Sequence, residues 1–222
     1  MSYILNIETA TKNCSVALAK EGKTILCKEI AEDGYSHAER LHVFIDEIIS
    51  EAGIQMKDLV AVAVSQGPGS YTGLRIGVSA SKGLCYALGI PLIAVDTMQS
   101  LASKVKTDDG LIVPMIDARR MEVYSAVFSA DLDKKREVLA EVITENSFEE
   151  LNEKIYFVGD CNEKCKTVLT KDNFVFLDEF KYPSANEMST LSFDKYKKND
   201  TVDVAYFEPH YLKDFLIATP KK

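Results

Sequence analysis

One stretch constrains the fold of this chain more than any other. Residues 65–77 read Ser-Gln-Gly-Pro-Gly-Ser-Tyr-Thr-Gly-Leu-Arg-Ile-Gly. The apolar run 59–64 before it predicts a buried strand, and residues 74–88 after it predict a helix. A glycine-rich turn between a strand and a helix gathers free N–H groups at the positive end of the helix dipole, which favours anions. The candidate residual anion or nucleotide contacts there are Gly67, Gly69, Ser70, Thr72 and Arg75.

This stretch is not a Walker A loop. The pattern G-x-x-x-x-G-K-[ST] cannot be written through it, and no Lys follows the glycines. The predicted strand, turn and helix therefore favour phosphate binding, but the lysine that contacts phosphate in a Walker A loop is missing. Arg75 lies one turn inside the predicted helix, where it could contact an anion or pair with Glu8 or Asp96.

Composition excludes several classes of protein. The chain has 222 residues, 46% of them hydrophobic, and a formal net charge of −8. An acidic chain binds nucleic acid poorly by itself, so we expect contact with RNA only through a complex. The five sparse cysteines predict free thiols rather than disulfides or a zinc site, and no apolar run reaches membrane-spanning length. We expect a cytoplasmic protein that does not bind membranes.

The order of predicted elements indicates an α/β protein of two similar halves. Three β-like runs at 3–7, 14–19 and 24–30 open the chain. A helix opened by a capping box at Ser36, the 60–64 strand, the second helix, a strand at 92–95 and a third helix capped by Asp96 follow. After a polar linker come β-like runs at 111–116, 123–128, 138–143, 155–158 and 174–177, with helical segments at 147–154, 163–170 and 185–197. This predicts an N-terminal lobe over 1–104 and a smaller, degenerate C-terminal lobe over 105–222.

Four motifs together resemble the TsaB (YeaZ) family of bacterial tRNA threonylcarbamoyladenosine biosynthesis proteins. They are the opening hairpin, the glycine-rich stretch, Ile-Asp-Ala-Arg-Arg-Met-Glu-Val-Tyr at 116–124, and Glu-Pro-His-Tyr-Leu-Lys-Asp at 208–214. The resemblance implies an actin-like ATPase (ASKHA, ribonuclease H-like) fold with two lobes, each a mixed sheet flanked by helices. It also implies a role as obligate partner of a homologous catalytic subunit, TsaD, with a third ATPase subunit, TsaE. That system attaches a threonylcarbamoyl group to the adenosine next to the anticodon of certain tRNAs.

The residues themselves argue against catalysis. Actin-like ATPases cradle phosphate with an Asp-x-Gly-Thr turn in each lobe, but the turns here read Glu-Thr-Ala-Thr at 8–11 and Asp-Ala-Arg-Arg at 117–120, without glycine. We expect the bulky arginines to occupy the phosphate space of the second turn. We assign no catalytic residue and no tightly bound cofactor, and we expect ATP or ADP contact only at the interface of a complex.

No metal site is predicted either. His37 and His42 are five residues apart, which turns their side chains about 140° from each other on a helix. They therefore do not match the His-x-x-x-His pair that the resemblance implies for the catalytic relatives. Two alternatives to the subunit role remain: a stand-alone actin-like phosphotransferase and, with less support, a peptidase.

Small residues recur along the second helix at Gly73, Gly77 and Ser81. Such a ridge either packs inside the domain or lets another helix approach closely. The resemblance favours a partner surface, completed by Leu41, Ile45 and Ile48 of the first helix. We expect this surface to bind the catalytic homologue and, in its absence, a second copy of the chain.

Overall fold

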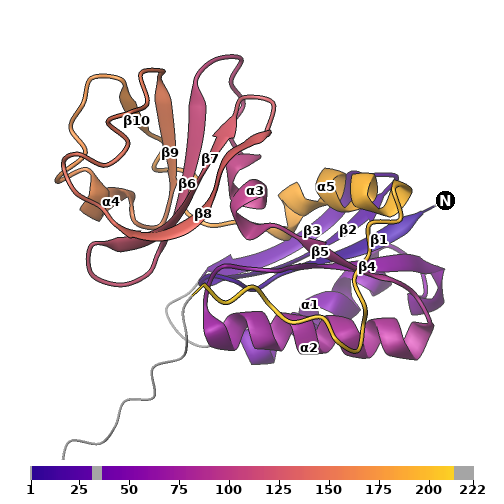
Figure 1. Ribbon diagram of the computed structural model, residues 1–222. Coiled ribbons are helices and arrows are strands. Elements are labelled where there is room, and N and C mark those ends of the chain that lie inside the picture. The colour runs from indigo at the N-terminus through magenta and orange to yellow at the C-terminus, as the bar shows by residue number, and fades with distance from the viewer. Residues whose placement is uncertain (1, 32–36, 213–222) are drawn as a thin grey trace, which may run out of the picture.

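Two lobes, each built on a five-stranded mixed sheet, make up the computed structural model, which describes residues 2–31 and 37–212 (Figure 1). The first sheet contains β1 (Tyr3–Glu8), β2 (Asn13–Lys20), β3 (Lys23–Ala31), β4 (Leu59–Ser65) and β5 (Leu92–Val95), in the order β3-β2-β1-β4-β5. β1, β2 and β3 pair antiparallel, and β4 and β5 continue the sheet in parallel with β1. The central strands are almost continuously buried, as expected for a sheet covered on both faces.

Helices cover both faces of the first sheet. α1 (His37–Glu51) and α2 (Tyr71–Leu88) pack on one face, and the short 3₁₀ helix η1 (Met56–Asp58) joins α1 to β4. α5 (Ala185–Lys197) packs on the opposite face, on the other side of the sheet in Figure 1. The apolar stripes of these helices bury the strand side chains, which explains why amphipathic segments flank strands that are apolar throughout.

The second lobe repeats the topology of the first. Its sheet contains β6 (Leu111–Asp117), β7 (Glu122–Ser129), β8 (Lys134–Val142), β9 (Ile155–Gly159) and β10 (Phe174–Phe176), in the order β10-β9-β6-β7-β8. An antiparallel meander is again extended by two parallel strands. The short helix α3 (Thr97–Ala102) packs on β6 and β7, and α4 (Asn162–Cys165) follows β9. The expected architecture of two lobes, each a mixed sheet with helices packed on it, is therefore confirmed.

Two helices expected in the second lobe differ from the prediction. The segment 147–154 is not helical: turns extend only to residue 150, because Phe148 has a φ of 63° and buries its ring in the second core. The segment 163–170 is helical only over α4. β8 starts at Lys134 rather than at residue 138, since its pairing with β7 begins where Lys134 meets Phe128.

The end of the described chain returns to the first lobe. The helix expected at 185–197 forms with those bounds, but Ala185 and Met188 pack on the first sheet, against small residues such as Ala61 and Ala63. The division at residue 104 had placed this helix in the second lobe. Residues 202–212 then run back past β5 and α2, so the first lobe is closed by the C-terminal segment.

Helix starts follow their capping residues. Ser70 caps α2 by accepting from the Gly73 N–H, which places the helix start at Tyr71, three residues before the predicted one. Asp96 caps α3 as predicted, accepting from the N–H groups of Met98 and Gln99. The capping residue predicted for α1, Ser36, lies outside the described residues.

Candidate functional site

The glycine-rich turn before α2 is occupied by the chain's own β1–β2 turn. The Ser70 N–H donates to the Ala10 carbonyl at 2.6 Å, and the Thr9 hydroxyl donates to the Gly73 carbonyl at 2.8 Å. A Cβ on Gly69 would come within 3.0 Å of Ala10, and one on Gly73 within 3.0 Å of the Thr9 carbonyl oxygen. The glycines therefore admit a neighbouring strand turn at the place where a phosphate-binding loop would admit a phosphate.

The beginning of the same turn is covered by the C-terminal segment. The Gly67 N–H donates to the Thr97 hydroxyl at 3.0 Å, and the His210 N–H donates to the Gln66 carbonyl at 2.7 Å. Gly67 has a φ of 102°, and a Cβ there would meet the His210 carbonyl oxygen at 2.9 Å. Of the motif at 208–214, residues 213 and 214 lie outside the described residues.

Only part of the candidate anion set faces solvent. Thr72 and Arg75 are exposed on the first turns of α2, as is Ser70. The Arg75 guanidinium lies over the ring of Tyr71, 4.4 Å from its centroid, and that ring contacts Tyr211 at 5.1 Å. Neither acidic partner considered for Arg75 is used: the Glu8 carboxylate accepts from the Ala10 N–H, and the Asp96 carboxylate pairs with Lys134.

Glu8 occupies the position of a phosphate-turn acid but is sealed inside the protein. Its Oε1 accepts from the Ala10 N–H at 2.6 Å, and its Oε2 has no hydrogen-bond partner. Burial raises the pKa of Glu8 from 4.5 to about 7, against the lowering effect of the Ala10 N–H. The side chain is 0% exposed, so this acid does not face a substrate in the isolated chain.

The corresponding turn of the second lobe is held by a lysine. Lys164 of α4 donates to the carbonyl oxygens of Arg120 at 2.6 Å and Glu122 at 2.9 Å, and it pairs with the Asp117 carboxylate. The expectation that arginines fill this space is wrong: both Arg119 and Arg120 are exposed. Sequence reasoning missed Lys164, because a lone lysine 44 residues after the turn gives no local signal.

The residues proposed as a partner surface point inward. Leu41, Ile45 and Ile48 are at most 3% exposed and belong to the core under α1. Ser81 is 0% exposed and donates to the Gly77 carbonyl, and a Cβ on Gly77 would collide with the Thr9 hydroxyl. The small-residue ridge of Gly73, Gly77 and Ser81 therefore packs inside the lobe, because it must let the β1–β2 turn approach α2.

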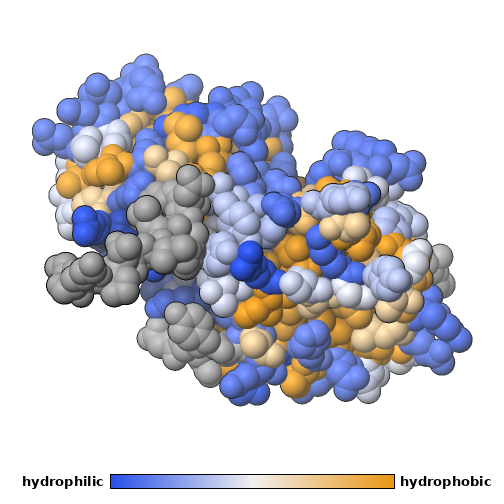
Figure 2. Space-filling model, turned by 60° about the horizontal axis from the view of Figure 1, so that its bottom comes forward, coloured by the Kyte–Doolittle hydropathy of each residue, from blue (hydrophilic) through white to orange (hydrophobic). Residues whose placement is uncertain are grey.

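The outward faces of the same two helices form a shallow apolar groove of about 520 Å³. We call this surface the helix groove. It is lined by Ala38, His42, Ile76, Ser79, Ala80, Gly83 and Leu84. Figure 2 turns this side of the molecule forward and shows hydrophobic residues gathered on it. The spacing of Ile76, Ala80 and Leu84, next to the buried ridge, was a signal in the sequence for this surface.

The histidines and cysteines do not form a reactive centre. His37 is buried with its Nε2 2.7 Å from the Thr11 carbonyl oxygen, whereas His42 is exposed in the helix groove. All five cysteines are free thiols, and burial raises the pKa of Cys14 and Cys85 to about 11. Within residues 2–31 and 37–212 there is no group of three or more His, Cys, Asp or Glu placed to hold a metal ion. Among the helices of this described part, none is long and apolar enough to cross a membrane.

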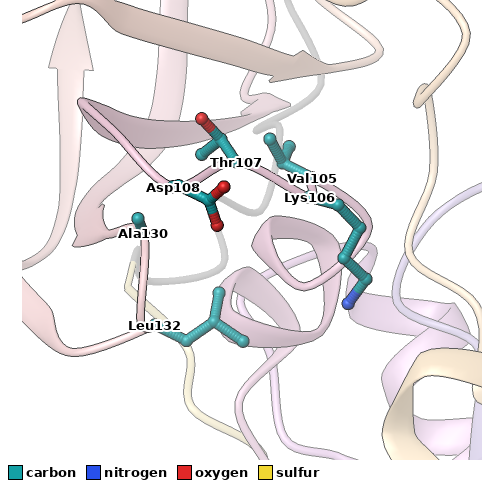
Figure 3. Close-up of a pocket in the computed structure, with 6 residues that line it drawn as sticks. All are labelled: Val105, Lys106, Thr107, Asp108, Ala130 and Leu132. Carbon is teal, nitrogen blue, oxygen red and sulfur yellow. The ribbon is translucent and has the colours of Figure 1, made fainter.

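A second, smaller pocket of about 290 Å³ lies where the linker between the lobes meets the β7–β8 turn (Figure 3). Asp108 points its carboxylate into this pocket, toward Leu132, while the Lys106 side chain extends away from it and donates to the Ser103 carbonyl. One carboxylate without a paired base or nucleophile gives this pocket no evident chemistry.

Comparison with known proteins finds a family model and relatives that match most of the chain. A family model described as TsaD, tRNA N6-adenosine threonylcarbamoyltransferase, matches residues 29–218. The chain is 30% identical to the tRNA threonylcarbamoyladenosine biosynthesis protein TsaB of Escherichia coli over 220 residues, covering 95% of this chain and 94% of the relative. The TsaB protein of Bacillus subtilis is also 30% identical, over 219 residues, covering 95% of this chain and 93% of the relative.

Solved structures place the fold in the same group. YeaZ from Pseudomonas aeruginosa superposes with a TM-score of 0.84 and 26% identity, covering 96% of this chain and all of that one. An activator of 2-hydroxyisocaproyl-CoA dehydratase from Clostridium difficile, solved with bound ADPNP, shares the fold at a TM-score of 0.50 and 9% identity, covering 90% of this chain and 96% of that one. With its two repeated lobes and full-length similarity to these relatives, the chain belongs to the TsaB (YeaZ) family of tRNA threonylcarbamoyladenosine biosynthesis proteins.

Proposed function

We propose that this chain is a non-catalytic subunit that scaffolds or activates a TsaD-type catalytic homologue in threonylcarbamoyl transfer to tRNA. The acceptor is the adenosine next to the anticodon. Similarity to TsaB proteins over 95% of the chain supports the pathway, and the match to a TsaD family model supports kinship with the catalytic subunit. A TsaE-type ATPase completes the complex, and this chain meets tRNA as part of that complex.

One observation carries the non-catalytic part of the proposal: the first phosphate turn, residues 8–11, is packed against the glycine-rich turn of the same lobe. Thr9 and Ala10 fill the space beside Gly69 and Gly73. A nucleotide phosphate would have to displace these contacts. ATP or ADP contact is therefore expected only at an interface with the partner, where Thr72 and Arg75 remain exposed.

The helix groove is the surface that we assign to the catalytic homologue. It is apolar and concave, and small side chains at Ala38, Ala80 and Gly83 would let a partner helix approach closely. In the absence of that homologue, we expect the same groove to mediate self-association of the chain. This assignment keeps the expected helices but replaces the buried residues with the exposed and half-buried residues of the groove.

Two serines on α2 provide a matched test. Ser79 is exposed in the helix groove, whereas Ser81, two residues later, is fully buried. Ser79→Trp should leave the chain folded and weaken co-purification with the catalytic homologue roughly 5- to 150-fold, as overpacking of about 1–3 kcal/mol implies. Ser81→Trp should instead lower the melting temperature.

The proposal fails if the wild-type chain does not co-purify with a TsaD-type homologue. It also fails if Ser79→Trp retains full affinity while the wild type binds, because the groove would then not be the contact. The stand-alone phosphotransferase would be supported by ATP-dependent phosphoryl transfer from the isolated chain, and a peptidase by cleavage of peptide substrates.

A further inference from the structure

The turn between β6 and β7 has an unusual backbone. Arg119 and Arg120 both have positive φ angles, 77° and 53°, in the left-handed region that residues other than glycine rarely adopt. Two such residues in succession require support from the surrounding structure. The turn connects the first two strands of the second lobe, as the Thr9–Thr11 turn does in the first lobe.

Contacts behind the turn supply that support. The Arg119 N–H donates to Asp117 Oδ1 at 3.0 Å, and the Asp117 N–H donates to Asp160 Oδ1 at 2.9 Å. The Lys164 ammonium group donates to the carbonyl oxygens of Arg120 and Glu122. These bonds use the backbone and the carboxylates of the turn, and they leave the two arginine side chains to project outward.

Neither guanidinium has an ion-pair partner among residues 2–31 and 37–212. Both arginines are exposed, and among the described residues neither takes part in an ion pair, whereas Arg136 pairs with Glu141 at 2.5 Å. The carboxylate two residues before Arg119, that of Asp117, is paired with Lys164 instead. The chain has 34 acidic against 26 basic residues, and this supported turn presents two adjacent arginines without an ion pair among the described residues.

We infer that Arg119 and Arg120 contact the phosphate backbone of the RNA substrate, weakly in the isolated chain and more strongly when the complex is assembled. This inference rests on the proposed function. A guanidinium offers a planar set of donors that matches two phosphate oxygens, and a turn that is already held in place loses little freedom on binding. The turn belongs to the second lobe and the helix groove to the first, so one chain can present both surfaces.

The test removes the charges without disturbing the turn. Asparagine tolerates the left-handed region, so the double variant Arg119→Asn/Arg120→Asn should melt at the wild-type temperature. A matched control, Lys57→Gln/Lys135→Gln, removes the same charge from two exposed lysines that have no ion pair among the described residues. Both variants are assembled with the catalytic homologue and titrated with tRNA transcript between 50 and 200 mM salt.

The arginine variant should bind tRNA more weakly and with a shallower dependence of log affinity on log salt. Each lost phosphate contact should reduce that slope by about 0.7–0.9, and two contacts by about twice as much, whereas the control keeps the wild-type slope. An unchanged slope in the arginine variant overturns the inference. Loss of assembly with the catalytic homologue also overturns it, because the arginines would then contact protein.

The same titration with the isolated chain at low salt separates this inference from the proposed function. If the wild-type chain does not assemble with the homologue, the proposed function fails. A weaker tRNA affinity and shallower slope of the isolated arginine variant would still support the phosphate contact, and identical titrations would refute it.

Discussion

The hydroxyl of Thr9 donates a 2.8 Å hydrogen bond to the carbonyl oxygen of Gly73, which joins the β1–β2 turn to the first turn of α2. This contact needs a residue without a side chain, because a Cβ on Gly73 would come within 3.0 Å of the Thr9 carbonyl oxygen. The glycine-rich stretch is thus explained by close packing within the lobe. The strand, turn and helix that the sequence predicts are present, and the β1–β2 turn packs against them.

Gly73→Ala should destabilise the fold, because the added methyl group meets backbone that cannot move aside. Overpacking of this kind costs about 1–3 kcal/mol, measurable by urea denaturation. Gly83→Ala on the same helix is the control: nothing lies within 4 Å of its added Cβ, so better helix propensity should stabilise the protein by up to about 1 kcal/mol. Equal stability of the two variants would contradict the packing described here.

Much of the fold could be predicted because periodicity and capping are local signals. The strands of both sheets and α5 lie close to their expected positions, and Asp96 caps α3. The features that could not be predicted depend on contacts with residues that are far away in the sequence. The segment containing Phe148 has helix-forming residues, but burial of this ring in the second core selects a turn. An amphipathic α5 does not show which sheet it covers.

The candidate site, like the fold, could be predicted only where the signals are local in sequence. The two turns and the two helices could be predicted, but the wrong face of α2 was assigned to the partner. Two rows of residues spaced by four run along this helix, one through Gly77 and one through Ile76, and their spacing does not distinguish them. The structure shows that Thr9 packs against the row that contains Gly77, whereas the row that contains Ile76 lines the helix groove. Lys164 could not be found for a similar reason: its three partners on the second turn are far away in sequence.

Lys164→Met should loosen the second-lobe turn. The substitution keeps most of the aliphatic chain but removes the ammonium group that binds Asp117 and two carbonyl oxygens. Hydrogen bonds to charged groups contribute about 1.5–3 kcal/mol, reduced here because the lysine side chain is 23% exposed. Thermal melts should show a clear loss for Lys164→Met and almost none for Lys135→Met at an exposed position. A melt at the wild-type temperature for Lys164→Met would show that the turn is held without it.

Purified chain should not turn over ATP at a rate typical of enzymes. The reason is steric, since Thr9 and Ala10 of the first phosphate turn pack against Gly69 and Gly73 and leave no space there for a phosphate. Phosphate release should stay far below about 1 per second, the low end of usual kcat values. A faster rate that copurifies with the wild-type chain and is lost in Glu8→Gln would identify it as an enzyme.

Glu8 should make the stability of the protein depend on pH. Burial raises its pKa in the folded state to about 7, above the ordinary value of 4.5, so between these two values the folded chain holds a proton that the unfolded chain has released. The free energy of unfolding should therefore fall as pH rises from 4.5 to 7, by roughly 3 kcal/mol from this group. Glu8→Gln removes the titration and should keep a neutral side chain in the same space. The variant should gain stability relative to the wild type as pH increases over this range and keep that gain above pH 7.

Urea denaturation at pH 5, 6, 7 and 8 measures the difference, with Glu150→Gln at an exposed site as the control expected to follow the wild-type curve. A constant difference between wild type and Glu8→Gln across these pH values would mean that Glu8 is ionised throughout, and that a compensating partner replaces the lost hydration of its unpartnered Oε2.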